Sequence, residues 1–205
     1  KKRHKMMAKL VGAMAFLSPV LGFSRLPSTL FVGRRVSVSS MASRADEIAK
    51  NLADNGLVLP PPGAPKANYN LVSRDGDLLY VSGHLPAVQG ADLILGKLAP
   101  EGKDGLSIEE GYEAAKWCAL NMVSTIEREL DGDLGKVVKV IKLFGIVAGT
   151  EDFQNQHLVM NGASDTMGQV FGKEVGGVHA RSAIGTNSLP LGVPVEVEAV
   201  VRVAP

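Results

Sequence analysis

From His179 to Ala199 the chain reads HARSAIGTNSLPLGVPVEVEA. In the second half of this stretch, and on to Val203, apolar residues occupy every other position and most of the residues between them are polar. This alternation is typical of a β-strand that buries one face and presents a more polar face on the other side. The apolar series is Val193, Val195, Val197, Ala199, Val201 and Val203. We therefore expect a last strand over 193–203 and another strand before it, over 180–188.

The segments before this pair of strands also carry local signals. A β-branched run over 137–147 predicts a central strand. Ser107 and Glu110 stand three residues apart in a capping box, which predicts the start of a long helix. Asp75-Gly76 between two apolar runs predicts a β-hairpin. Upstream of 180, the expected elements are helices over 44–55, from Ser107 to about Leu130 and over 153–171, and strands over 69–73, 78–82 and 137–147.

This order of elements predicts an α+β fold with one mixed sheet and its helices on one face. Such a layer leaves the second face of the sheet without a cover from the same chain. We expect an oligomer to supply that cover, with the apolar row over 193–203 exposed in the single chain and buried between subunits.

The N-terminal region has a different composition. Residues 1–44 contain nine Lys or Arg and no Asp or Glu, and Ser and Arg are frequent over 24–44. This composition is typical of an organellar transit peptide, for a mitochondrion or a plastid. The alternatives are a secretory signal followed by a transit peptide and a disordered basic tail. The apolar run over 10–23 is too short for a confident membrane span, so we expect no membrane association of the mature protein.

These observations divide the chain into three parts. Residues 1–40 are expected to be a disordered targeting peptide. Residues 41–66 are expected to hold a helix and a Pro-rich connector over 59–65, and 67–205 the α+β domain.

Composition excludes several classes of function. The net charge is +1, which gives no indication of a nucleic-acid partner, and a single Cys118 cannot form a thiolate metal cluster. The four histidines show no zinc-helix spacing. The sequence has no P-loop, dinucleotide fingerprint or nucleophile elbow. We therefore expect neither a metal nor a cofactor.

Two separated motifs resemble the reactive-intermediate imine deaminase family (RidA or YjgF-type, also known as the L-PSP endoribonuclease family). One is Ala-Arg181-Ser, then Leu-Pro, then Glu196-x-Glu-Ala; the other is Tyr69, thirteen residues, then Gly83 after a serine. The resemblance covers about 140 residues, from the Pro-rich connector to Pro205. Two features differ from the family pattern and indicate a divergent branch: Ala183 stands where a cysteine is common, and the interval from 153 to 181 is about seven residues longer.

The resemblance implies a chorismate-mutase-like fold in a barrel-like homotrimer with a site in each cleft between subunits. It implies that Arg181 holds the carboxylate of a 2-imino or 2-oxo acid and that Gly83 lets the backbone approach the ligand. It also implicates Tyr69 and Glu196, which can orient a water. Asn161 is the candidate for a site-lining asparagine, although His157 occupies the ungapped position. Without the motif, Arg181 and Glu196 read as solvated strand residues, Tyr69 as packing and Gly83 as a strand end.

The implied activity is hydrolysis of reactive 2-imino acids to 2-oxo acids and ammonia without a cofactor. A planar guanidinium suits a carboxylate because it donates two parallel hydrogen bonds. A trimeric binder of small carboxylates without catalytic activity is the alternative, because it needs only the same arginine. Ribonuclease activity is less favoured, because the mature part has no basic stripe.

Overall fold

The computed structural model describes residues 38–205, with side chains from residue 44 onward. The expected targeting peptide, 1–40, therefore lies outside the described residues except for 38–40, which belong to helix α1 (Val38–Asp54). This helix begins before the expected start at 44, and residues 38–43 contain neither Gly nor Pro to interrupt it. No helix within the described part of the chain is both long and apolar enough to cross a bilayer.

The domain contains a single mixed sheet, as the sequence predicts. Its strand order is β1-β2-β5-β3-β4, and all neighbours are antiparallel except β3 and β4. The parallel pair needs a crossover, which the helices α3 (Gln156–Val159) and α4 (Asn161–Phe171) provide. The strands are β1 (Val72–Asp75), β2 (Leu78–His84), β3 (Val137–Ala148), β4 (Ala180–Thr186) and β5 (Val195–Val203), and the longer helices after α1 are α2 (Ile108–Glu129) and α4 (Asn161–Phe171).

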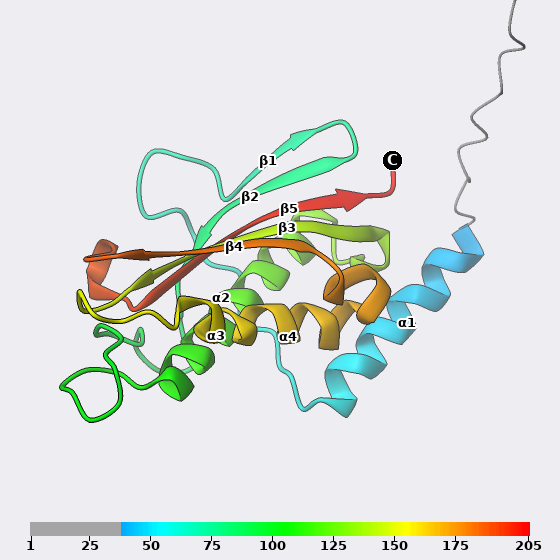
Figure 1. Ribbon diagram of the computed structural model, residues 1–205. Coiled ribbons are helices and arrows are strands. Elements are labelled where there is room, and N and C mark those ends of the chain that lie inside the picture. Colours follow the sequence, from blue (N-terminus) through cyan, green and yellow to red (C-terminus); the bar gives the residue numbers. More distant parts are fainter. Residues whose placement is uncertain (1–37) are drawn as a thin grey trace, which may run out of the picture. The chain divides into compact units, whose positions relative to one another are not determined.

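Helices α2, α3 (Gln156–Val159) and α4 lie on one face of this sheet (Figure 1). The apolar row of the last strand faces them. Val195, Val197 and Val201 are fully buried against helices of the same chain, and Ala199 and Val203 are nearly so. The expectation that this row forms an exposed interface between subunits is therefore wrong. Alternation predicts that one face is apolar but not what covers it, and here small and apolar side chains on α2 pack onto β5.

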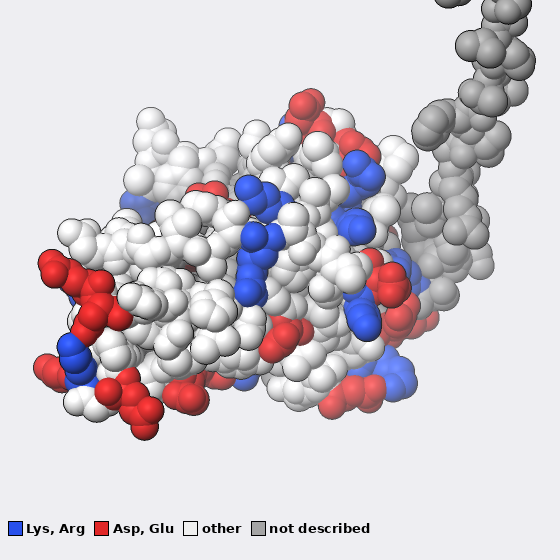
Figure 2. Space-filling model, in the orientation of Figure 1, with Lys and Arg blue, Asp and Glu red and all other residues white. Residues whose placement is uncertain are grey.

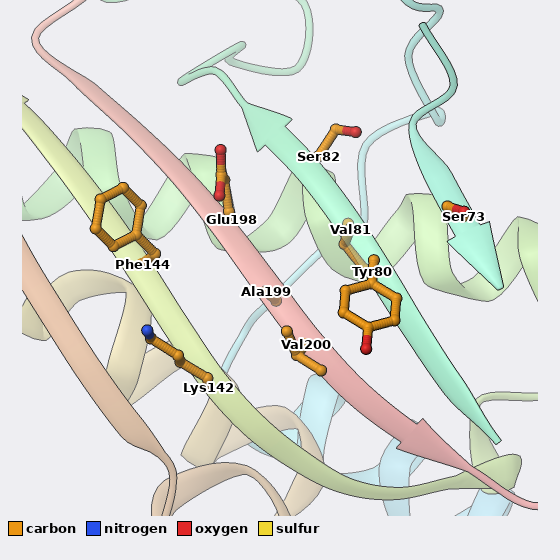
Figure 3. A pocket seen from close by; sticks show the side chains of 9 residues that line it. All are labelled: Ser73, Tyr80, Val81, Ser82, Lys142, Phe144, Glu198, Ala199 and Val200. Atoms are coloured by element: carbon orange, nitrogen blue, oxygen red, sulfur yellow. The ribbon is translucent and has the colours of Figure 1, made fainter. Parts of the chain in front are cut away.

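The opposite face of the sheet has no cover among the described residues. It carries Tyr80, Lys142, Phe144, Glu198 and Val200, which Figure 3 shows projecting from β2, β3 and β5. These side chains line a hollow of about 560 Å³, and the Tyr80 side chain is 47% exposed. We call it the open face. It is mixed in character, with aromatic and aliphatic groups beside one acid and one base.

Two expected elements differ from the structure in ways that affect the site. The helix expected over 153–171 is broken at Met160 into α3 and α4. Gly162 then sits so close to α2 that a Cβ there would lie 2.0 Å from the Tyr112 carbonyl oxygen. The hairpin strand begins at Val72 instead of Tyr69, because Tyr69 closes a short turn through its backbone bond to the Ala67 carbonyl, 3.0 Å.

Candidate functional site

Arg181 lies on β4, the edge strand of the sheet, on the face that carries the helices. It is paired with Leu143 of β3, a fully buried residue, and paired residues share a face. The break between α3 and α4 places three oxygen acceptors around the guanidinium. Nη1 donates to Asn161 Oδ1 at 3.0 Å and to Ser164 Oγ at 2.8 Å, and Nη2 donates to the His157 carbonyl at 3.0 Å.

All three partners of Arg181 are neutral. No carboxylate among residues 44–205 lies within ion-pair distance of its guanidinium. A guanidinium has five N–H donors, so Nε–H and one Nη2–H have no partner in this part of the chain. The group is thus held in place while its charge stays uncompensated, which suits it to bind an anion.

Gly83 and Glu196 form a second cluster, on neighbouring strands β2 and β5. The register of this pair shifts between Val81 and His84, so Gly83 lies in a bulge. A Cβ at Gly83 would lie 1.7 Å from Glu196 Oε1, so the carboxylate packs against the bare backbone of the glycine. Burial raises the pKa of Glu196, and the neighbouring Glu198 adds to the rise. Such a carboxylate takes up a proton more readily than an exposed one.

Tyr69 joins this second cluster through a cavity of about 310 Å³ beneath the Pro-rich connector. Tyr69, Gly83 and His84 line it, together with small and aliphatic side chains and with Lys66, Asp92 and Asn121. The Tyr69 side chain is 41% exposed, so it is not a core packing residue. Its hydroxyl accepts a long hydrogen bond, 3.5 Å, from the Lys66 backbone.

His84 lines this cavity and was not among the site residues predicted from the sequence. Its Nδ1 bonds the Ser82 carbonyl at 2.7 Å and its Nε2 bonds Thr125 Oγ1 at 2.8 Å. Burial lowers the pKa of His84, so the neutral ring is favoured. With Nδ1 donating to a carbonyl, Nε2 accepts from the Thr125 hydroxyl. The only sequence signal was its place directly after Ser82-Gly83.

The two clusters do not meet within one chain. Arg181 and Asn161 come together as expected, whereas Gly83 lies against Glu196 and lines one cavity with Tyr69. However, β3 separates β5 from β4, and neighbouring strands are about 4.8 Å apart. Glu196 pairs with Ile146 and faces the open side, whereas Arg181 faces the helices. One small ligand cannot touch Arg181 and Glu196 of the same chain.

Sequence reasoning also missed two residues beside Arg181. Ser164 Oγ, which accepts from Arg181, lies 3.0 Å from His179 Nε2, and His179 Nδ1 lies 2.6 Å from the Gly176 carbonyl. Neither residue is part of the Ala-Arg-Ser motif, although His179 directly precedes it. Ser164 lies on α4, and His179 follows a five-residue π-helical turn, Lys173–Gly177, inside the long interval before β4.

Other reactive groups do not build a site. Cys118 is fully buried, and burial raises the pKa of its thiol well above the ordinary value. Across residues 38–205, no three His, Cys, Asp or Glu side chains converge as metal ligands.

A mixed five-stranded sheet with helices on one face, an arginine on its edge strand and a glycine–glutamate pair on its inner strands define a chorismate-mutase-like α+β protein. Comparison with known families agrees. A family model described as "YjgF/chorismate mutase-like, putative endoribonuclease" matches residues 49–200. The chain belongs to this YjgF/chorismate mutase-like family.

Individual relatives support this assignment. Protein TCP17 of Trypanosoma cruzi is 42% identical over 155 residues, which cover 76% of this chain and 93% of TCP17. The crystal structure of Atu1372 from Agrobacterium tumefaciens, a protein of unknown function, is 39% identical with a TM-score of 0.69, covering 80% of this chain and 97% of its own. A Shewanella oneidensis protein structure, 28% identical, also gives 0.69 and covers 76% and 99%.

Proposed function

We propose that this protein hydrolyses reactive 2-imino acids to 2-oxo acids and ammonia, without a cofactor. The observation that carries the proposal is the Arg181 guanidinium, which is fixed by three neutral oxygens and keeps two donors and its full charge for an anion. A 2-imino acid presents a carboxylate next to the reactive C=N carbon. Membership of the YjgF/chorismate mutase-like family supports the proposal, because Arg181, Gly83 and Glu196 belong to the two sequence motifs that resemble the imine deaminases.

We further propose that the complete site forms between subunits of a homotrimer. The separation of the two clusters supports this arrangement, because each chain offers Arg181 at one edge of its sheet and Glu196 with Gly83 and Tyr69 elsewhere. The open face, which carries Tyr80, Phe144 and Val200, is a surface that neighbouring subunits could cover. Closed symmetry would bury it without leaving a free patch.

In this arrangement the chemistry needs only side chains and water. Arg181 of one subunit holds the substrate carboxylate. Glu196 of the neighbour, in its ionised form, accepts a proton from a water while the water oxygen bonds to the imine carbon. The imine nitrogen takes up the proton that Glu196 has accepted, which regenerates the carboxylate and gives an aminoalcohol. The carbon–nitrogen bond then breaks as the hydroxyl proton passes to the leaving nitrogen, which departs as ammonia. The products are one 2-oxo acid and one ammonia for each water consumed.

The proposal is tested by measuring ammonia released from an imine that an amino-acid oxidase generates in situ. Arg181→Ala removes a charge-assisted contact of about 1.5–3 kcal/mol, so we expect a loss of roughly ten- to a hundredfold. Arg181→Lys should not restore the rate, because an ammonium cannot make the paired contact.

The matched control is Arg74→Ala, which removes a positive charge from the β1 hairpin, where Arg74 bonds only the Gly76 carbonyl at 3.1 Å. It should behave like the unmodified protein. Equal ammonia release by the unmodified chain, Arg181→Ala and a protein-free blank would remove the enzyme proposal. Calorimetry with 2-oxobutyrate would then decide whether a carboxylate binder without catalytic activity remains.

Ribonuclease activity is less favoured by the charges of the chain. On the face shown in Figure 2, a short run of basic side chains crosses the middle, acids gather toward one end, and both kinds of charge occur toward the other. The net charge of +1 lacks the strongly basic balance that is typical of a nucleic-acid-binding domain.

A further inference from the structure

The hydrogen bonds behind Arg181 form a directional chain. The Gly176 carbonyl can only accept, so His179 Nδ1 carries a proton and donates to it, at 2.6 Å. In the neutral ring Nε2 is then an acceptor, and the Ser164 hydroxyl, 3.0 Å away, donates to it. The lone pairs of Ser164 Oγ are left for the Arg181 Nη1–H at 2.8 Å. Each group therefore fixes the orientation of the next, from Gly176 to Arg181.

The starting point of this chain is held rigidly. Gly176 lies in the π-helical turn against α4, and a Cβ there would be 1.9 Å from the Met167 carbonyl oxygen. Any side chain would push the turn away from the helix. Because Ser164 lies on the same helix, the turn and α4 together set the distance between the Gly176 carbonyl and the Ser164 hydroxyl.

We propose that Ser164 and His179 are positioning residues for Arg181, which orient its guanidinium toward the substrate carboxylate. This inference rests on the proposed function, because it needs Arg181 to bind an anion. Preorganisation matters here because an arginine side chain has several rotatable bonds, and a site that must first order it binds more weakly. Asn161 and the His157 carbonyl hold two further N–H groups, and Ser164 adds the contact whose direction His179 controls.

The competing interpretation is structural: His179 could serve only to fasten the π-helical turn. Two substitutions separate the roles, because the amide of Asn reaches about as far as imidazole Nδ1 and that of Gln about as far as Nε2. His179→Asn keeps the donor to Gly176 and loses the acceptor for Ser164. His179→Gln keeps the acceptor for Ser164 and loses the donor to Gly176.

The first experiment needs no ligand. Nitrogen-15 NMR of the arginine side chains, with the Arg181 signals assigned by Arg181→Ala, reports how restricted the guanidinium is. We expect protected Nη signals in the unmodified protein and in His179→Gln, and faster rotation or exchange in Ser164→Ala and His179→Asn. Unchanged Arg181 signals in both of the latter variants would overturn the proposal, whatever the protein does to imines.

The second experiment measures 2-oxobutyrate binding by calorimetry. We expect Ser164→Ala and His179→Asn to bind roughly tenfold more weakly, with Ser164→Thr and His179→Gln closer to the unmodified protein. The matched control is Ser124→Ala, which removes a buried hydroxyl that bonds the Leu120 carbonyl on α2, 3.1 Å away; it should leave binding unchanged if the variant melts normally.

The outcomes distinguish the two proposals. If Arg181→Ala binds 2-oxobutyrate as well as the unmodified protein, the proposed function fails, and the NMR result alone decides whether Ser164 and His179 position Arg181. If Arg181→Ala weakens binding while Ser164→Ala and His179→Asn do not, the proposed function stands and the positioning role of Ser164 and His179 is wrong. If His179→Gln is the damaging substitution and His179→Asn is not, the residue only fastens the turn.

Discussion

Gly83 and Glu196 act as one unit, because the backbone of one residue is the packing surface of the other. The three atoms nearest to a Cβ built at Gly83 all belong to the Glu196 side chain, at 1.7, 2.6 and 2.9 Å. The tight fit therefore depends on a movable side chain, and a substitution at Gly83 should act through the position of the carboxylate.

We predict that Gly83→Ala destabilises the protein by about 1–3 kcal/mol, as overpacking usually does. In a Glu196→Ala background the same substitution should cost less than about 1 kcal/mol, because the obstructing atoms are gone. Urea unfolding of the four proteins in this cycle measures the coupling. Gly63→Ala, which would meet nothing within 4 Å, is the control. A coupling energy near zero would contradict the described packing.

The raised pKa of Glu196 predicts a pH-dependent stability. A carboxyl whose folded-state pKa lies above its unfolded value contributes stability that is fully present below the unfolded pKa, near 4.5, and is lost as pH rises through the folded pKa. Glu196→Gln has the same shape and cannot ionise. We expect it to gain stability over the unmodified protein between pH 4 and pH 7, while losing activity at pH 7.

Urea unfolding at the two pH values tests this expectation. Glu198→Gln is the comparison, because Glu198 is only the second cause of the shift and is exposed; its gain should be smaller. A stability difference between Glu196→Gln and the unmodified protein that does not change with pH would show that the carboxyl is not perturbed.

At the scale of elements, α2 could be predicted from sequence because its start is encoded locally. Ser107 Oγ accepts from the Glu110 backbone at 3.2 Å, and Glu110 Oε2 accepts from the Ser107 backbone at 2.8 Å. The break between α3 and α4 could not be predicted, because it depends on the close packing of Gly162 against Tyr112 of α2, which is distant in sequence. For the same reason Ser164 of α4 and the π-helical turn before His179 were not predicted, although Asn161 was a candidate. Gly83 and Glu196 were predicted because each belongs to a short sequence motif.

The capping box gives a prediction for this element. Ser107→Ala should cost about 1 kcal/mol, which lowers Tm by about 2–4 °C for a domain of this size. Ser107→Asp should retain most of the stability, because a carboxylate also accepts from the Glu110 N–H and favours a helix start. Thermal melts followed by circular dichroism measure both. An Ala variant that melts with the unmodified protein would mean that the cap contributes nothing.

At the scale of the whole molecule, sequence patterns predicted the single mixed sheet but assigned the wrong surface to assembly. The strict alternation of β5 marked an apolar face, and that face turned out to be the core of the chain. The open face combines Tyr80, Phe144 and Val200 with Lys142 and Glu198 and has no periodic signature. Targeting by residues 1–40 to a mitochondrion or plastid stays a proposal, which a fluorescent fusion of that segment would test.

The proposed shared site makes a prediction that a single-chain site does not. Arg181→Ala and Glu196→Gln should each lose most of the activity alone, and light scattering should give three times the mass of one chain for both. When the two variants are unfolded together and refolded, some clefts receive Arg181 from one chain and Glu196 from the other. With random mixing, about a quarter of the clefts in a cyclic trimer contain both native residues, so ammonia release should return to about a quarter of the unmodified rate. Refolding each variant separately and then mixing the products is the control, and it should stay at the low rate of the single variants while subunits do not exchange. No recovery in the co-refolded sample, although trimers have formed, would contradict a cleft that combines Arg181 of one chain with Glu196 of another, and a monomer by light scattering would exclude the shared cleft altogether.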